Sequence, residues 1–562
     1  MVLPTNKMVG LRGESRLPSP DKRPEAWIAE PGFFEQFAGQ PLAVRLAGLD
    51  TASWRQPEYA STPDVDAHEQ DTRVRYHHRP GAFTLYDRGV CWFCHVRTIP
   101  TLDIAATGAH MIRMHDAADL PLTARNQAAI DACLRGLNSF NQWRVDAMSW
   151  LDEAIVCDDE FALPLIVKAW MLHLGRSAAF ADKVAGLIAG AEARLADDCP
   201  RQRRLLDALK KAHAGDSIEA ATLLECNTRS HPTDLFSHRL VQFELFWNGR
   251  AEWMREIVEA AAPAWREDTP GYGDFLSCRA FSNEEAGAHE EAEQHGRAAV
   301  EIRASDPWGA HAVAHVLLMQ GRIDDGVNWL ESLCENWDEA NQIKHHLWWH
   351  LALFLLERGE HARILELLTG RIRDPESPLV KAAPEATIDL QNVASMLLRL
   401  ELRGVDVGDG WQVLGDICSG RVHDHANAFS NAHDMMVLAA TAQFEAAEAL
   451  LTSAREFAAG SKGIGAGNAL ELSYASAGVA LCDAILAHRR GELAKVITSL
   501  SPVRHDLPRI GGSHAQRDLF YQILIDAAAR LGRADLVAIY LREAERIGFI
   551  QPEARTLYRE VA

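Results

Sequence analysis

The sequence predicts an all-α protein in which helical hairpins stack into a solenoid. Apolar residues recur at three- and four-residue spacing along most of the chain, which is the pattern of amphipathic helices. The alternating pattern of strands is nearly absent, and short turns containing glycine return at similar intervals. Apolar residues make up 48% of the 562 and charged residues 24%, a composition that indicates a folded protein and excludes general disorder.

The first 115 residues differ from the rest. They are rich in proline, arginine and histidine, as in residues 16–20 and 73–80, and they lack sustained helical periodicity. We expect residues 1–115 to form a poorly ordered N-terminal extension and residues 116–562 to form the helical repeat domain. Met111 and Met114 stand just before the regular region and are alternative start positions, and the sequence leaves open whether residues 1–110 belong to the native protein.

From about residue 116 the chain reads as helix after helix, each of roughly 10 to 16 residues, joined by short Gly, Pro, Asn or Asp segments. Ala162, Leu165, Ile166, Ala169 and Trp170 show the spacing, because all five fall on one face of a helix. This part of the chain is therefore predicted to be all-α.

The helices are predicted to repeat in pairs. Gly249, Gly287, Gly321 and Gly359 stand 38, 34 and 38 residues apart, close to the 34-residue helix–turn–helix unit of tetratricopeptide repeats. Glycine suits the left-handed backbone conformation at the turn between paired helices. Stacked pairs form a superhelix whose first helices line a concave surface. The predicted fold is an all-α, tetratricopeptide-like α-solenoid of stacked helical hairpins.

Net charge and composition limit the classes of molecule that the chain is expected to bind. Lysine and arginine total 57 against 78 aspartates and glutamates, and the formal net charge of −21 argues against binding to nucleic acid or to an anionic membrane. We find no run of about 18 apolar residues and no signal-peptide pattern, so neither a membrane span nor export is expected. The cysteines are scattered, which favours a reducing, cytoplasmic location. Cys91, Cys94 and His95 match the Cys-x-x-Cys-His motif of covalent haem attachment. Covalent haem attachment normally needs export of the protein, so we expect the match to have arisen by chance.

Four histidines occupy the predicted first helices of two successive repeats. His311 and His315 are four residues apart, as are His346 and His350, so each pair shares one helix face. We counted the residues between each histidine pair and the turn glycine of its own repeat. These separations place both pairs on equivalent faces of their helices. Neighbouring first helices are therefore predicted to present the four rings toward a common groove.

Three further residues are candidates for the same inner face. His433 lies ten residues before Gln443, which we place at the turn position of a third repeat. Arg517 and Asp518 open a later helix, whose N-terminus would attract anions. The candidate binding residues are His311, His315, His346, His350, His433, Arg517 and Asp518.

The chemistry of these residues has two interpretations. Histidines at i and i+4 can chelate a divalent metal, and a neutral histidine can act as a general base near pH 7. The plainer interpretation is that they are inner-face polar residues, hydrogen-bonded to neighbours or lining a peptide groove. The His-Glu-x-x-His pattern of zinc proteases is absent and no carboxylate accompanies the pairs at a fixed spacing, so the sequence assigns no metal ligands, no cofactor and no catalytic residue. The tryptophans are expected to pack between repeats.

In these histidine segments the chain resembles the tetratricopeptide repeat protein 38 family. The matching stretches, in order, are residues 231–235, 306–315, 346–353, 431–433 and 511–518. The resemblance runs from about residue 116 to the C-terminus. It implies a divergent α-solenoid, singles out the histidine helices and the Gln516-Arg517-Asp518 segment, and implies no established reaction.

The sequence favours a cytoplasmic helical-repeat protein that binds a peptide, a protein or a small-molecule ligand on its concave face and serves as an interaction scaffold. The alternative is an enzyme that uses the inner-face histidines and Arg517 on a small polar or anionic substrate. A third possibility is a structural solenoid that packs against itself. The sequence does not set the oligomeric state.

Overall fold

The structure is a computed structural model that describes residues 112–115, 120–195, 199–460 and 467–548, together with 555 and 557. The chain divides into two compact units, Met1–Cys91 and Trp92–Ala562, and all described residues belong to the second unit. The predicted extension up to residue 111 and the Cys91–Cys94 motif therefore lie outside the described residues.

A small antiparallel hairpin precedes the helices. Strand β1 (Ile112–His115) pairs with β2 (Pro121–Ala124), with Ile112 opposite Ala124. β1 belongs to the segment that we expected to be poorly ordered, because the prediction placed the domain boundary after residue 115. On β2, Leu122 and Ala124 are buried and join the core beside the first helices.

The rest of the described chain is helical, as predicted. The α-helices are α2 (Gln127–Asn141), α3 (Ala147–Cys157), α4 (Ala162–Leu174), α5 (Ala181–Arg194), α6 (Pro200–His213), α7 (Ser217–Ser230), α8 (Leu235–Phe246), α9 (Ala251–Ala261), α10 (Tyr272–Glu285), α11 (His289–Ile302), α12 (Pro307–Met319), α13 (Ile323–Leu333), α14 (Ile343–Arg358), α15 (His361–Leu367), α16 (Pro378–Ala382), α17 (Thr387–Glu401), α18 (Gln412–Ser419), α19 (Ala428–Ala440), α20 (Phe444–Ala459), α21 (Ala469–Ser473), α22 (Val479–Arg489), α23 (Leu493–Leu500), α24 (His514–Arg530) and α25 (Ala534–Ile547). Short 3₁₀ segments are η3 (Ala178–Phe180), η4 (Ala262–Ala264), η5 (Cys334–Asn336) and η8 (Ser501–Ile510), and π-helical segments are η6 (Leu368–Ile372) and η7 (Tyr474–Gly478).

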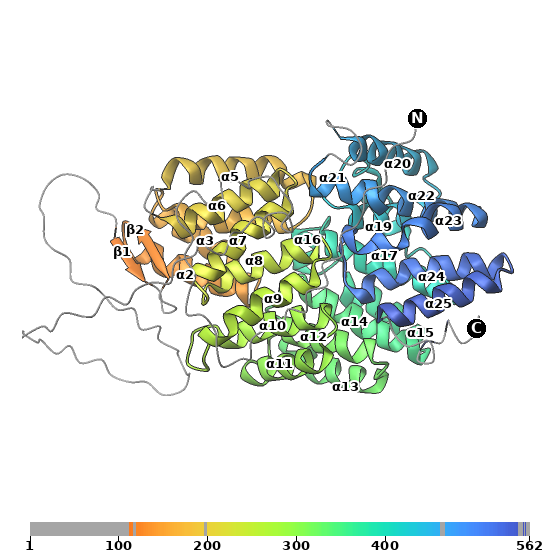
Figure 1. Ribbon diagram of the computed structural model, residues 1–562, viewed down its shortest axis with the longest axis horizontal. Coiled ribbons are helices and arrows are strands. Elements are labelled where there is room, and N and C mark those ends of the chain that lie inside the picture. The colour runs from red at the N-terminus through yellow and green to blue at the C-terminus, as the bar shows by residue number, and fades with distance from the viewer. Residues whose placement is uncertain are drawn as a thin grey trace, which may run out of the picture. The chain divides into compact units, whose positions relative to one another are not determined.

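Consecutive helices pack as antiparallel hairpins, so the fold is an all-α, tetratricopeptide-like solenoid (Figure 1). α2 packs on α3, α4 on α5, α6 on α7 and α10 on α11. The predicted turn glycines have the left-handed conformation, with φ of 62° at Gly249 and 67° at Gly321. This confirms the periodicity that predicted the repeat.

The turn after α19 corrects one predicted register. We placed Gln443 at the turn position, but Ala442 has the positive φ, 57°, and Gln443 is already the N-cap of α20. A non-glycine residue in the left-handed region is uncommon, which is why the sequence pattern missed it. His433 therefore lies nine residues before its turn residue, in the same phase as His350 before Gly359.

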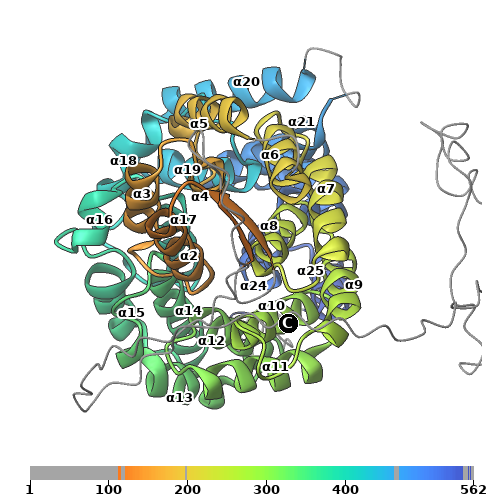
Figure 2. The same ribbon diagram turned by 90° about the vertical axis from the view of Figure 1, so that its left-hand side faces the viewer.

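Within this unit the repeats curl until early and late segments meet. In Figure 2 the outer helices follow one another around a ring, from α5 through α7, α9 and α11 to α13, α15, α18 and α20. Asn468 Nδ2 donates to the carbonyl of Ala214 at 2.8 Å, and Thr387 Oγ1 donates to the carbonyl of Gly175 at 3.1 Å. Residues more than 200 positions apart thus hold the ring together.

Curling encloses the inner helices. α8, α10, α12, α14, α17, α19 and α24 lie on the inner side of the ring (Figure 2). Every residue of α12, from Pro307 to Met319, is buried. The expected concave face is therefore interior, and its polar residues are part of the core of the described unit.

The segment Ala469–Arg489, which joins α21, η7 and α22, is long and apolar enough by length and composition to cross a membrane, with a mean hydropathy of 1.4 over its most apolar window. Half of that window is buried inside the structure. Leu481, Cys482 and Leu486 are fully buried and belong to the main core cluster, so packing against the neighbouring helices accounts for the apolar composition.

Candidate metal centre

α12 and α14 hold the four histidines that the sequence analysis paired. α12 starts sharply, because the Asp306 side chain accepts from the backbone N–H groups of Trp308 and Gly309. α11 and α12 approach very closely: a Cβ on Gly296 would lie 2.6 Å from Val313 Cγ2. Both features fix the position of α12 in the interior, and with it the direction of its histidine side chains.

The four rings converge on one point. His311 Nε2 lies 3.0 Å from His315 Nε2. The ring centroid of His350 is 4.8 Å from that of His311, 4.5 Å from that of His315 and 4.7 Å from that of His346. One ring nitrogen of each histidine lies within 4.8 Å of the corresponding nitrogen of the other three. We call these residues the four-histidine centre.

That geometry suits a metal ion. Zinc–imidazole bonds of about 2.0–2.1 Å place the nitrogens of a tetrahedral site about 3.3 Å apart, close to the observed 3.0 Å between His311 and His315. Imidazole ligands without thiolate suit zinc, copper, iron and nickel.

Burial keeps the rings neutral. The exposed fractions of the four residues are 3%, 0%, 5% and 0% in chain order. Loss of solvation lowers the pKa of His315 and that of His346 to about 4, and it lowers the pKa of His311 and His350 well below the ordinary value. A neutral imidazole keeps a lone pair on one ring nitrogen, and this is the form that binds metal.

A hydrogen bond from a neighbouring helix orients one ring, and a carboxyl group lies beside a second. His346 Nδ1 donates to Asn392 Oδ1 of α17 at 2.8 Å, which leaves the lone pair on Nε2. His315 Nδ1 lies 3.3 Å from Glu284 Oε2 of α10, near enough for an ion pair but without the geometry of a hydrogen bond. Histidine ligands in metal proteins are commonly held this way, with the second nitrogen bound to a carboxylate or an amide oxygen.

The other two rings lack such partners. Among the described residues, His350 has no hydrogen-bond partner at either ring nitrogen, and His311 has none at Nδ1. An unpaired polar atom in the interior costs about 1–3 kcal/mol, so native structures rarely leave one empty. The arrangement indicates that something outside the protein chain satisfies these nitrogens.

Two glutamates at the end of α10 adjoin the centre. Glu284 is fully buried and Glu285 is 6% exposed, and burial raises the pKa of each to about 8. Neither oxygen of Glu284 has a hydrogen bond among the described residues. An oxygen of Glu284, an oxygen of Glu285 and a nitrogen of His315 lie within 4.8 Å of one another. The sequence analysis missed both glutamates, although two successive acids in the helical turn before Gly287 were a visible signal.

Arg517 supplies positive charge to the glutamates. It lies in the first turn of α24, which Ser513 and Gln516 cap reciprocally. Its guanidinium donates to the carbonyl of Gly512, and its charge stabilises the ionised forms of Glu284 and Glu285. Burial lowers the pKa of Arg517 itself.

The remaining two predicted residues lie apart from this group. His433 is buried on α19, where Nδ1 donates to the carbonyl of Phe429 at 2.8 Å and the ring packs near Phe520. Asp518 is fully buried, accepts from Gln522 Nε2 at 2.6 Å and is ion-paired with Arg555. Helical phase predicted the inner-face position of both, but it could not predict which inner-face residues meet.

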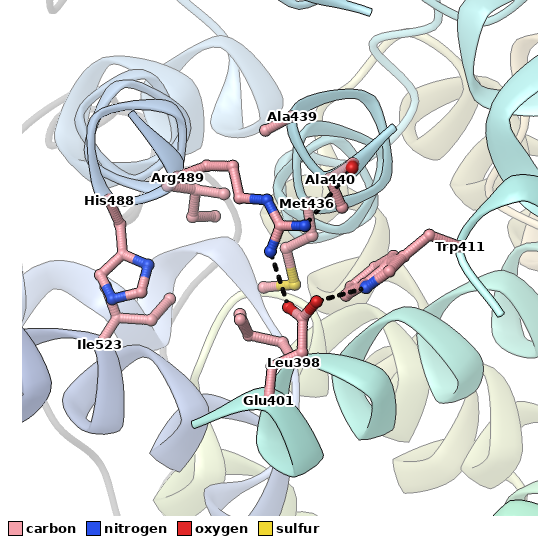
Figure 3. Close-up of a pocket in the computed structure, with 10 residues that line it drawn as sticks. Leu398, Glu401, Trp411, Met436, Ala439, Ala440, His488, Arg489 and Ile523 are labelled. Atoms are coloured by element: carbon pink, nitrogen blue, oxygen red, sulfur yellow. Dashed lines mark hydrogen bonds and ion pairs between the residues drawn. The ribbon is translucent and has the colours of Figure 1, made fainter. Parts of the chain in front are cut away.

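A surface pocket elsewhere has no residue in common with the centre (Figure 3). Glu401 lies at its middle, where Oε1 accepts from Trp411 Nε1 at 3.0 Å and Oε2 accepts from Arg489 Nη1 at 2.8 Å. Leu398, Met436 and Ile523 supply apolar walls. Both oxygens of the carboxylate are therefore paired within the pocket itself.

No family model matches the chain. Among solved structures, one titled "Structure of Naa15/Naa10 bound to HypK-THB" is similar over 76% of this chain and 65% of that chain, at 11% sequence identity and a TM-score of 0.21. This chain thus matches slightly less than two thirds of the solved one. At that TM-score the two structures do not superpose as wholes, so the match carries no information on the function of this chain.

Proposed function

We propose that this protein binds a first-row transition-metal ion in the four-histidine centre, and that this ion is part of its native core. The observation that carries the proposal is His350, a fully buried histidine with no hydrogen bond at either ring nitrogen and three other histidine rings within 5 Å of its own. A metal ion bound to the ring nitrogens removes the cost of leaving them unpaired.

The charges nearby support a cation. Burial raises the pKa of Glu284 and of Glu285 to about 8, so without a cation nearby both carboxyl groups are largely protonated near pH 7. Buried charges are stable in proteins when they are paired or bind a metal. A divalent ion on the four neutral imidazoles would stabilise the ionised carboxylates and lower both pKa values.

Metal content tests the proposal. The purified protein is stripped with a chelator, exposed to Zn²⁺, freed of excess ion and measured by plasma mass spectrometry. We expect at least one ion per chain in the wild type and one ion fewer in His350→Ala. His433→Ala is the matched control, because His433 is equally buried but hydrogen-bonded to a carbonyl, and it should keep the wild-type content. A wild type without metal, or a His350→Ala protein with unchanged content, contradicts the proposal.

A metal-dependent reaction on a small polar or anionic substrate is the second candidate function. It is favoured by the carboxylates and the guanidinium beside His315, since such groups can transfer protons and bind anions next to a metal. Phosphate and carboxylate esters are suitable probes. Hydrolysis above background that disappears in His350→Ala supports the candidate, and equal rates in both proteins contradict it.

Protein binding remains a proposal on a separate basis. Helical repeat arrays commonly serve as recognition surfaces, and the outer helices of this ring are free to do so. A peptide would reach the inner histidines only after the ring opened, because they are at most 5% exposed. Membership of the tetratricopeptide repeat protein 38 family, proposed from the sequence motifs, and a cytoplasmic location are further parts of this proposal. Val156 of α3 is 85% exposed, so affinity capture with Val156→Asp beside the wild type tests it, and identical partners in both contradict an interface on α3.

A further inference from the structure

We infer that His315 bridges two metal ions, one in the four-histidine centre and a second held by Glu284, Glu285 and the Nδ1 atom of His315. This inference rests on the proposed function, because the first ion is the one proposed above. It adds a second site, with oxygen ligands, on the side of the centre that faces α10 and α24.

The two nitrogens of His315 point to two different sets of ligands. Nε2 lies 3.0 Å from His311 Nε2, inside the four-histidine centre. Nδ1 lies 3.3 Å from Glu284 Oε2, on the other side of the ring. Both sets meet the same spacing, since within each one the candidate ligand atoms lie within 4.8 Å of one another. One imidazole can therefore serve both ions.

The carboxylates of this second set are available as ligands. Among the described residues, neither oxygen of Glu284 and not Oε1 of Glu285 has a hydrogen-bond partner. Glu285 Oε2 is 3.6 Å from His514 Nδ1, a contact too long for a strong hydrogen bond. Two adjacent buried carboxylates without hydrogen bonds are a costly arrangement, and a cation between them removes the cost.

Ligand number gives the two sites different chemistry. The four-histidine centre has four protein ligands, as closed structural sites have. The second site has three, which leaves a position for water, hydroxide or an anionic group, as in catalytic sites. When the second ion binds, the proton on His315 Nδ1 and the protons held by Glu284 and Glu285, whose pKa values are raised to about 8, are released to solvent, so that the ring bridges as an imidazolate. Arg517 carries the positive charge that would attract an anionic group to the open position.

Metal stoichiometry separates the two sites. Apo-protein titrated with Zn²⁺ should retain two ions per chain in the wild type and one in Glu285→Gln, which preserves side-chain shape. Glu244→Gln is the matched control, because Glu244 is also fully buried but is paired with Arg176 at 2.6 Å, and it should retain two. Circular dichroism confirms that each variant is folded.

Copper provides an independent readout. With Cu²⁺ in both sites, the imidazolate bridge should couple the two spins, so the wild type shows a weakened signal in electron paramagnetic resonance. Glu285→Gln should show the full signal of one isolated Cu²⁺ with nitrogen ligands. One ion per chain in both the wild type and Glu285→Gln overturns the second site and leaves the first intact. No ion in either protein overturns the four-histidine centre, and this inference with it.

Discussion

Two polar groups in the interior of the same repeat array differ in how completely they are paired. In the Asn431 network (Asp424, His425, Asn431, Ser453 and Tyr474), Asn431 Oδ1 accepts from Tyr474 at 2.7 Å and from His425 Nδ1 at 3.0 Å, and Asn431 Nδ2 donates to the Asp424 carbonyl at 2.8 Å. His425 Nε2 accepts from Ser453 at 2.7 Å. In the four-histidine centre, His350 has no hydrogen bond among the described residues.

The comparison teaches that burial alone does not mark a binding site. Asn431 is 1% exposed and His350 is fully buried, so exposure does not distinguish them. What distinguishes them is hydrogen bonding: the network satisfies its own polar atoms, and the centre does not. This difference is the reason why we propose a bound ion for the centre and not for the network.

The largest expected effect is the response to metal removal. A ligand present at 1,000 times its dissociation constant stabilises the folded state by about 4 kcal/mol, so chelation should lower the free energy of unfolding of the wild type by about that amount. His350→Ala lacks the ion of the four-histidine centre, so the chelator should lower its free energy of unfolding by less than that of the wild type. Urea unfolding with and without the chelator measures the free energy of unfolding of both proteins. An equal decrease in the two proteins would contradict a bound ion in the four-histidine centre.

Next in size is the effect of disrupting the network. Asn431→Ala removes the acceptor of Tyr474 and His425 and leaves both groups buried without it, which should cost about 3 kcal/mol of stability. Metal content should not change, because no atom of the network belongs to the four-histidine centre. A stable Asn431→Ala protein that loses metal would show that the two groups are one functional unit.

A pH-dependent effect on stability is expected at His433, a buried histidine that belongs to neither group. Burial, helped by the nearby charge of Arg399, lowers its pKa to about 4 in the folded state, against an ordinary value of 6.5. Between these values the unfolded chain binds more protons, so stability falls as pH decreases from about 6.5 to about 4 and levels off below. His433→Gln should remove at most about 3 kcal/mol of this pH dependence. Urea unfolding of apo-protein at pH 7 and pH 4.5 measures it, and unchanged pH dependence in the variant contradicts the assignment.

The smallest effect is expected at the surface pocket of Figure 3. Arg489→Ala breaks a 2.8 Å ion pair with Glu401, but both side chains are partly exposed, at 37% and 23%. Such pairs contribute less than about 1 kcal/mol. Thermal unfolding should show a shift of a few degrees at most, with full metal content. A loss comparable to that of Asn431→Ala would mean that this carboxylate is as important as a core group.

Local sequence patterns predicted the helices and the four histidines of the candidate centre. The i, i+4 spacing of His311 and His315, and of His346 and His350, follows from helical periodicity alone. The phase relative to the turn glycines then placed both pairs on inner helices. These predictions needed only information contained within single repeats.

The rest depended on contacts between distant segments. Glu284 and Asn392 approach the centre from α10 and α17, and no spacing rule relates them to the histidines in α12 and α14. Enclosure of the inner face depends on contacts such as that between Asn468 and Ala214, which arise only when small rotations between repeats accumulate around the ring. Ala442, in the left-handed conformation without being glycine, concealed the register of the third histidine helix.

Anomalous X-ray diffraction from crystals of the metal-loaded protein tests the central claim most directly. The account predicts an anomalous difference peak, at the absorption edge of the bound metal, among the ring nitrogens of His311, His315, His346 and His350. It also predicts that the peak is absent from crystals of His350→Ala and present in those of His433→Ala. Crystals grown with metal in which those four nitrogens surround only water, or bind only one another, would contradict the account.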